Sequence, residues 1–201
     1  MDWHIILAVL SGILCFASVV PYVRDIVYGT TRPNITTWFL WLFIQVIAIA
    51  VQFHEGASWS IVMVIADAIT IALVFFLSVV GYGYRLYTTF DMWCGILGVI
   101  AILSWQMTGN ALYALAFAII ADICAALPTI KKAYLDPWSE NPTGWASTMV
   151  AAILAIASTT RFDLANVLFP AYLVIINALT FTLAFSGRRS QNKPIKDVII
   201  K

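Results

Sequence analysis

The sequence predicts an all-α membrane protein whose seven transmembrane helices form two parallel three-helix repeats joined by a linker helix. Three observations lead to this prediction: an apolar composition, a series of charge-free stretches, and similarity between the two halves of the chain. Of the 201 residues, 62% are hydrophobic and 10% are charged, against roughly 45 to 50% and about 25% in an ordinary soluble domain. The surplus apolar surface must face lipid, because a soluble fold of this size exposes many residues to water.

The composition also excludes several classes of protein. A net charge of +1 leaves no basic excess for binding nucleic acid. Transmembrane β-barrels alternate apolar and polar residues over about ten positions, whereas this chain has long unbroken apolar runs. The sequence contains neither a nucleotide-binding loop nor a metal-ligand cluster. We therefore expect no enzyme activity, no metal and no cofactor.

The charge-free stretches are long enough to cross a membrane, since a helix needs roughly 20 residues to span the hydrocarbon core. They predict seven spans, at about residues 4–21, 35–53, 57–80, 92–107, 111–128, 143–160 and 164–186. Only the turn-forming triplet 108–110, Thr-Gly-Asn, separates the fourth span from the fifth. Six spans are therefore the alternative.

The basic residues distinguish seven spans from six, because cytoplasmic loops carry an excess of Lys and Arg. With seven spans and the N-terminus outside, ten of the eleven basic residues are cytoplasmic: Arg24, Arg32, Arg85, Lys131, Lys132, Arg188, Arg189, Lys193, Lys196 and Lys201. Only Arg161 is then outside, whereas joining the fourth and fifth spans would move seven of the ten to the outside. We expect a multi-pass protein of the cell (inner) membrane with a cytoplasmic C-terminus.

An internal repeat relates the two halves of the chain. Its most informative pairs, at shifts of 107 and then 110 residues, are Pro21 with Pro128, Asn34 with Asn141, Trp38 with Trp145, Asp67 with Asn177, and Thr70 with Thr180. Both units start outside, so they are parallel repeats about an axis along the membrane normal. The predicted parts are a first unit at 1–84, a linker helix at 85–110, a second unit at 111–187 and a cytoplasmic tail at 188–201.

Two acidic residues, Asp67 and Asp122, fall deep inside predicted spans. An ionised carboxylate there costs about 2.5 to 3.5 kcal/mol. Each is interpreted either as a solute-binding or proton-carrying group, or as a hydrogen-bonded group that only holds helices together. Asp67 shares a helix face with Thr70, as Asn177 does with Thr180, so these four are the predicted solute-binding residues. Asp122 and its repeat partner Cys15 form a predicted proton site or second polar site.

The chain resembles the SWEET, MtN3 and PQ-loop superfamily of small seven-helix transporters. The resemblance rests on two three-helix units, a linker helix, and, in each unit, a Pro followed by a short basic loop and a Trp, in segments 21–38 and 128–145. The literal Pro-Gln pair is absent, because Tyr22 and Thr129 stand in the place of Gln.

The resemblance implies alternating access around a central pocket. An Asn on the third helix of each unit lines that pocket in the family, which implies this role for Asn177 and, with a substitution, for Asp67. It also implies that Pro21 and Pro128, with Trp38 and Trp145, act as hinges or gates. Plain termination of the helices is the alternative for the two prolines.

The resemblance further implies a small polar solute, with sugar as the first expectation. A proton-coupled transporter of an amino acid or another small metabolite is an alternative, because two acidic residues lie inside predicted spans. A non-transporting receptor or scaffold is a further alternative, because a fold does not determine a function. The expected partners are the solute, protons, the lipid bilayer and, since related folds often pair, a second copy of the chain.

Overall fold

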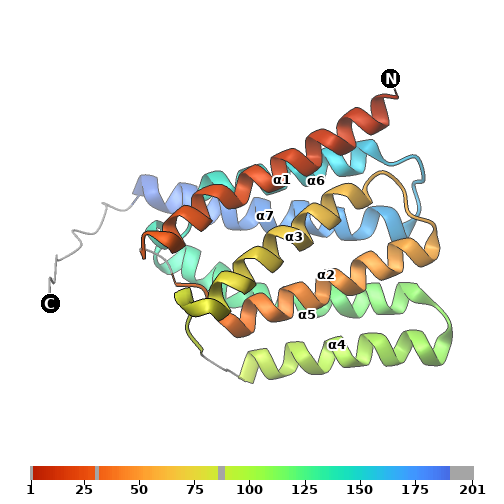
Figure 1. Cartoon of the computed structure of the whole chain (residues 1–201), viewed down its shortest axis with the longest axis horizontal. Helices are drawn as coiled ribbons and strands as arrows, with labels where there is room; N and C mark the ends of the chain where they lie inside the picture. The colour runs from red at the N-terminus through yellow and green to blue at the C-terminus, as the bar shows by residue number, and fades with distance from the viewer. Residues whose placement is uncertain (1, 30–31, 86–88, 191–201) are drawn as a thin grey trace, which may run out of the picture.

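The computed structural model describes residues 2–29, 32–85 and 89–190, and these residues are almost entirely helical (Figure 1). The helices are α1 (Trp3–Val27), α2 (Ile35–Glu55), α3 (Ile61–Leu77), α4 (Thr89–Thr108), α5 (Ala111–Leu135), α6 (Pro142–Ser158) and α7 (Leu164–Ser190). A π-helical turn, η1 (Ser78–Tyr82), extends α3, and a 3-10 turn, η2 (Pro137–Ser139), precedes α6. The described residues contain no β-strand, so the all-α prediction is confirmed for them.

Five helical segments of the described chain are long and apolar enough to cross a membrane. They are Trp3–Val27, Ile35–Glu55, Ile61–Tyr82, Ala111–Leu135 and Leu164–Arg189, while Pro142–Ser158 and Gly95–Thr108 are apolar but shorter. Large apolar side chains face outward, among them Ile13, Phe76 and Ile175 at 61%, 61% and 68% exposure. Apolar exposure on this scale is unusual for a soluble monomer, and the helices are compatible with an integral, multi-pass membrane protein.

The prolines do not end the first helix of either half. The predicted spans stopped at residues 21 and 128, but α1 continues beyond Pro21 to Val27 and α5 beyond Pro128 to Leu135. Termination at these prolines is therefore wrong. A proline removes one backbone donor and crowds the preceding turn, yet in an apolar setting helix is the conformation that satisfies the remaining backbone groups.

Local capping explains where other helices begin and end. Asn34 and Asn141 cap α2 and α6, each accepting over 3.0 Å from the backbone N–H two residues later. Gly109, with φ at 65°, forms the turn between α4 and α5. Left-handed backbone favours glycine there, so the triplet at 108–110 divides two helices.

The two halves pack in corresponding ways. In the first half α3 contacts both α1 and α2, and in the second α7 contacts both α5 and α6. Between the halves α1 packs on α6, and α2 packs on α5. Fully buried alanines on α5 and α6, including Ala114, Ala118 and Ala155, let neighbouring backbones approach closely. Helix α4 lies at one edge of the bundle, against α5 and α2 (Figure 1).

The bundle has two ends of different charge. The basic end carries the connections α1–α2, α3–α4 and α5–α6 and the end of α7; its described basic residues are Arg24, Arg32, Arg85, Lys131, Lys132, Arg188 and Arg189. The amino-terminal end carries the chain start, the connections α2–α3, α4–α5 and α6–α7, and Arg161. Lys193, Lys196 and Lys201 of the expected tail lie outside the described residues.

Candidate functional site

A cavity of about 390 Å³ lies between the two halves. It reaches from the connections at the basic end, where Arg32, Asn34 and Glu140 border it, inward to Asp67 and Asp122. Its described lining comes from α1, α2, α3, α5, α6, α7 and the adjoining connections, and none of it from α4. The volume falls within the range of about 300 to 1,000 Å³ that is typical of small-molecule sites.

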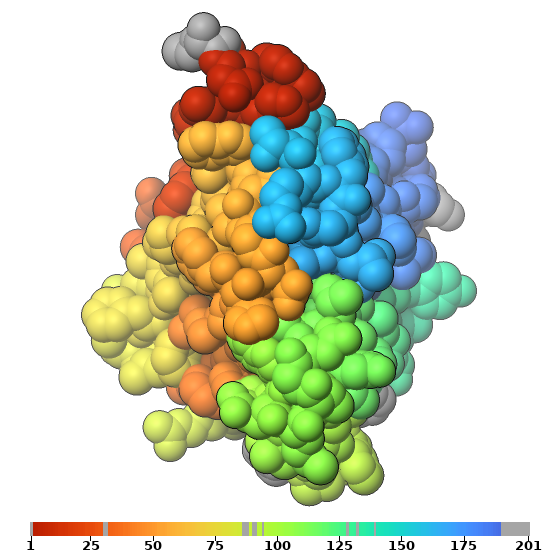
Figure 2. Space-filling model, turned by 90° about the vertical axis from the view of Figure 1, so that its right-hand side faces the viewer, coloured from red at the N-terminus to blue at the C-terminus, as the bar shows by residue number. Residues whose placement is uncertain are grey.

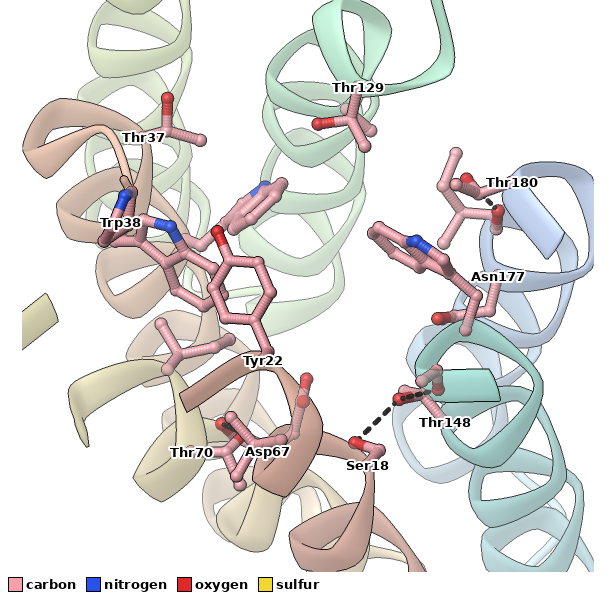
Figure 3. A pocket seen from close by; sticks show the side chains of 18 of the residues that line it. Ser18, Tyr22, Thr37, Trp38, Asp67, Thr70, Thr129, Thr148, Asn177 and Thr180 are labelled. Carbon is pink, nitrogen blue, oxygen red and sulfur yellow. Dashed lines mark hydrogen bonds between the residues drawn. The ribbon is translucent and has the colours of Figure 1, made fainter. Parts of the chain in front are cut away.

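The four predicted solute-binding residues all line this cavity. Asp67 and Thr70 of α3 lie on one side, and Asn177 and Thr180 of α7 lie on the other (Figure 3). Their spacing of three residues puts each pair on one helix face, as the sequence predicts.

The other predicted site residues divide between the cavity and its surroundings. Lining side chains include those of Asp122, Pro21, Trp38 and Trp145. Cys15 is fully buried and stands behind Asp67 rather than in the lining. For Pro128 the structure describes only the backbone.

Asp67 is held by donors from two other helices. The Cys15 thiol of α1 donates to Oδ1 over 3.6 Å, and the Gln45 amide of α2 donates to Oδ2. The buried Oε1 of Gln45 has no hydrogen-bond partner. Gln45 thus contributes to the cavity lining through other atoms, while this oxygen is inaccessible.

Among the residues that the structure describes, the Tyr172 hydroxyl of α7 holds Asp122 by donating to its Oδ2. Each carboxylate therefore joins the first and third helices of its own half: α1 to α3 through Cys15 and Asp67, and α5 to α7 through Asp122 and Tyr172. Both carboxylates line the same cavity.

Sequence reasoning missed two of these donors. Gln45 is a neutral polar residue inside a predicted span, so a search for charged residues does not find it. An amide in lipid nevertheless needs a hydrogen-bond partner, as a carboxylate does. Tyr172 carries no comparable signal, because tyrosine is common in membrane helices and only packing brings its hydroxyl to Asp122.

The smaller polar side chains of the cavity donate to their own helices. Ser18 and Thr70 donate to the carbonyl three residues earlier, and Asn177 and Thr180 to the one four residues earlier, over 2.6 to 2.9 Å. This back-bonding is common for short polar side chains in helices. It uses the three hydroxyl protons locally and leaves their oxygen lone pairs, of which Ser18 Oγ already accepts from the Thr148 hydroxyl over 3.1 Å, and the second amide proton of Asn177.

Aromatic side chains surround the passage between the acids and the basic end. This aromatic collar consists of Tyr22, Trp38, Trp41 and Trp145. The ring centroids of Tyr22 and Trp38 are 5.4 Å apart, and those of Trp38 and Trp41 are 5.1 Å apart, edge to face. Figure 3 shows Tyr22 and Trp38 together on one side of the opening.

The amino-terminal end is closed by contacts between the α2–α3 and α6–α7 connections. We call these contacts, among Gly56, Ser58, Thr159, Thr160 and Asn166, the latch. The Ser58 N–H donates to Asn166 Oδ1 over 2.8 Å, and the Ser58 hydroxyl accepts from the Thr160 N–H and the Thr159 hydroxyl, each over 2.7 Å.

The Asn166 amide completes the latch by donating to the Gly56 carbonyl over 3.3 Å. Figure 2 looks onto this end, where atoms of the two connections abut. Sequence reasoning did not find the latch, because its members are ordinary loop residues that only the fold brings together.

Comparison of the chain with protein-family models, curated proteins and solved structures found no match. The class of this protein therefore rests on its fold and its site alone. The protein is a helical bundle compatible with a membrane, with a cavity that contains two carboxylates and reaches one end of the bundle, and with a hydrogen-bonded closure at the other end.

Proposed function

We propose that the protein moves a small polar solute across a membrane by alternating access. The observation that carries this proposal is the combination of a central cavity, which contains two carboxylates and reaches the basic end, with a latch at the opposite end. Ionisable groups in the middle of membrane helices mark solute and ion pathways in many transporters. The state described is the one in which the cavity is accessible from the basic end.

The repeat architecture in this proposal has seven transmembrane helices, with α1–α3 and α5–α7 as the units and α4 as the linker. Corresponding packing of the two halves supports it, as do the matching caps at Asn34 and Asn141. The absence of α4 from the described cavity lining agrees with a linker role. Helix α6, with 17 residues, lies at the lower limit for a span, which is about 17 to 25.

Membership of the SWEET, MtN3 and PQ-loop superfamily is part of the same proposal. The segments 21–38 and 128–145 support it, since each runs from a proline to a tryptophan that lines the cavity. The excess of Lys and Arg at the basic end favours a cytoplasmic location for that end. The N-terminus is then outside, and the cavity described is open to the cytoplasm.

The resemblance makes sugar the first solute to test. Proton-coupled transport of an amino acid or another small metabolite is the second candidate, and the two carboxylates of the cavity favour it. A carboxylate that exchanges protons with the cavity can couple solute movement to a pH gradient.

Uptake by purified protein reconstituted in lipid vesicles tests the proposal. A panel of sugars and amino acids is measured with and without a pH gradient, beside vesicles that lack protein. Uptake without a gradient supports a facilitator, and uptake that the gradient drives supports proton coupling. Failure of every solute to enter, together with co-purification of a partner protein, would favour a receptor or scaffold instead.

A further inference from the structure

We propose that the solute is a small organic cation bearing an amino or guanidino group, which binds between Asp67 and Asp122 after passing the aromatic collar. This inference rests on the proposed function insofar as the cavity is the transport site. Three independent features of the described cavity carry it: its charge, its hydrogen-bonding groups and its aromatic side chains.

The charge of the cavity is one-sided. Among its described lining residues Asp67, Asp122 and Glu140 are acidic, whereas Arg32 at the mouth is the single basic one. The partners of Asp67 are a thiol and an amide, and that of Asp122 is a phenol, so the inner cavity holds two carboxylates without a described cation. Carboxylates at membrane depth are costly unless paired, and a cationic solute supplies the missing charge.

The hydrogen-bonding groups point to the same class of solute. The hydroxyl protons of Ser18, Thr70 and Thr180 and one amide proton of Asn177 are directed to backbone carbonyls, and the Tyr172 proton is directed to Asp122. Around the two carboxylates these side chains therefore present chiefly oxygen lone pairs to a bound molecule, beside the second amide proton of Asn177.

Ammonium and guanidinium groups match these lone pairs, because they donate hydrogen bonds and accept none. A neutral sugar fits less well. Each sugar hydroxyl needs a donor for its lone pairs as well as an acceptor for its proton.

The aromatic collar adds a favourable route for a cation. Faces of Trp and Tyr attract ammonium and guanidinium groups within about 6 Å of the ring centroid, and Trp does so most strongly. Trp38, Trp41 and Trp145 line the passage through which a solute from the basic end reaches the acids. A neutral solute of the same size gains no such attraction.

Equilibrium binding of matched pairs tests the inference without relying on transport. The full-length purified protein is dialysed against labelled glucosamine or glucose, and against labelled arginine or citrulline, so that each pair differs chiefly in one positive charge. We expect the charged member of at least one pair to bind about tenfold tighter than its neutral partner. Asp67→Asn and Asp122→Asn should each remove this preference, whereas Asp25→Asn, outside the described cavity lining, should retain it.

A second variant keeps the test decisive if an Asp variant fails to fold. Trp38→Phe retains an aromatic ring but weakens attraction to a cation, so it should weaken binding of the charged probe several-fold while leaving binding of the neutral probe unchanged. Equal or tighter binding of the neutral members in both pairs, or no binding of any probe, would overturn the inference.

Flux separates this inference from the proposed function. Selective binding of a cation without uptake into vesicles would retain the inference and contradict transport. Uptake of glucose or citrulline without any preference for the charged probes would retain transport and contradict the inference.

Discussion

The backbone N–H of Ser58 donates to the side-chain oxygen of Asn166 over 2.8 Å, joining positions that are 108 residues apart. Both residues are buried, and the same Asn166 side chain also donates to the Gly56 carbonyl. One amide thus connects the α2–α3 connection to the beginning of α7. In an alternating-access cycle, this contact has to break when the cavity opens at the amino-terminal end.

Replacing Asn166 with Ala should loosen the latch. The Ser58 N–H would lose its acceptor while still buried, at a cost of about 1 to 3 kcal/mol. Hydrogen exchange measured by mass spectrometry should then show residues 56–60 exchanging about 5 to 150 times faster than in the unmodified protein.

Asn110→Ala is the matched control for this exchange experiment. Asn110 lies at the same end of the bundle, but its side chain accepts locally, from the Leu112 N–H over 3.0 Å. Its replacement should leave exchange at 56–60 unchanged. The latch would have no closing role if Asn166→Ala behaved like this control.

Asp67→Asn and Asp122→Asn should each abolish any uptake driven by a pH gradient. An amide is similar in size to a carboxyl group, but unlike a carboxylate it cannot take up and release a proton near neutral pH. Uptake in reconstituted vesicles should fall to the rate measured without a gradient. Asp25→Asn serves as the control, because the Asp25 side chain pairs with Arg24 outside the described cavity lining. Full gradient-driven uptake in both cavity variants would contradict proton coupling through Asp67 and Asp122.

Tyr172→Phe should destabilise the protein by removing the donor to Asp122. A hydrogen bond to a charged group contributes about 1.5 to 3 kcal/mol, so the thermal unfolding midpoint of the purified protein should fall measurably. Tyr113→Phe, which changes a side chain that is 51% exposed, should have little effect. A double-mutant cycle with Asp122→Asn isolates the pair, and a coupling energy of zero would show that the contact is not stabilising.

The seven-span topology predicts opposite locations for the two termini. An epitope tag placed before Met1 should react with antibody on intact cells, and a tag placed after Lys201 should react only after permeabilisation. The charge distribution is the reason, because ten basic residues belong to the end predicted to be cytoplasmic. Labelling of the C-terminal tag on intact cells would contradict the seven-span topology.

Residue order alone was enough for the helical class, for the turn at Gly109 and for the placement of Asp67, Thr70, Asn177 and Thr180 in one cavity. These features are local. A membrane helix satisfies its own backbone groups, and residues three apart share a face wherever the helix packs. The repeat then related α3 to α7 without any knowledge of how the helices pack.

Other features depend on packing between distant segments. The partners of Asp67 come from 52 and 22 residues away and that of Asp122 from 50 residues away, and the latch joins residues 108 apart. Packing also decides that α1 continues past Pro21 and at which end of the bundle the cavity is accessible. Local pattern cannot reveal these features, because hydrogen bonds between helices form only after packing has brought their donors and acceptors together.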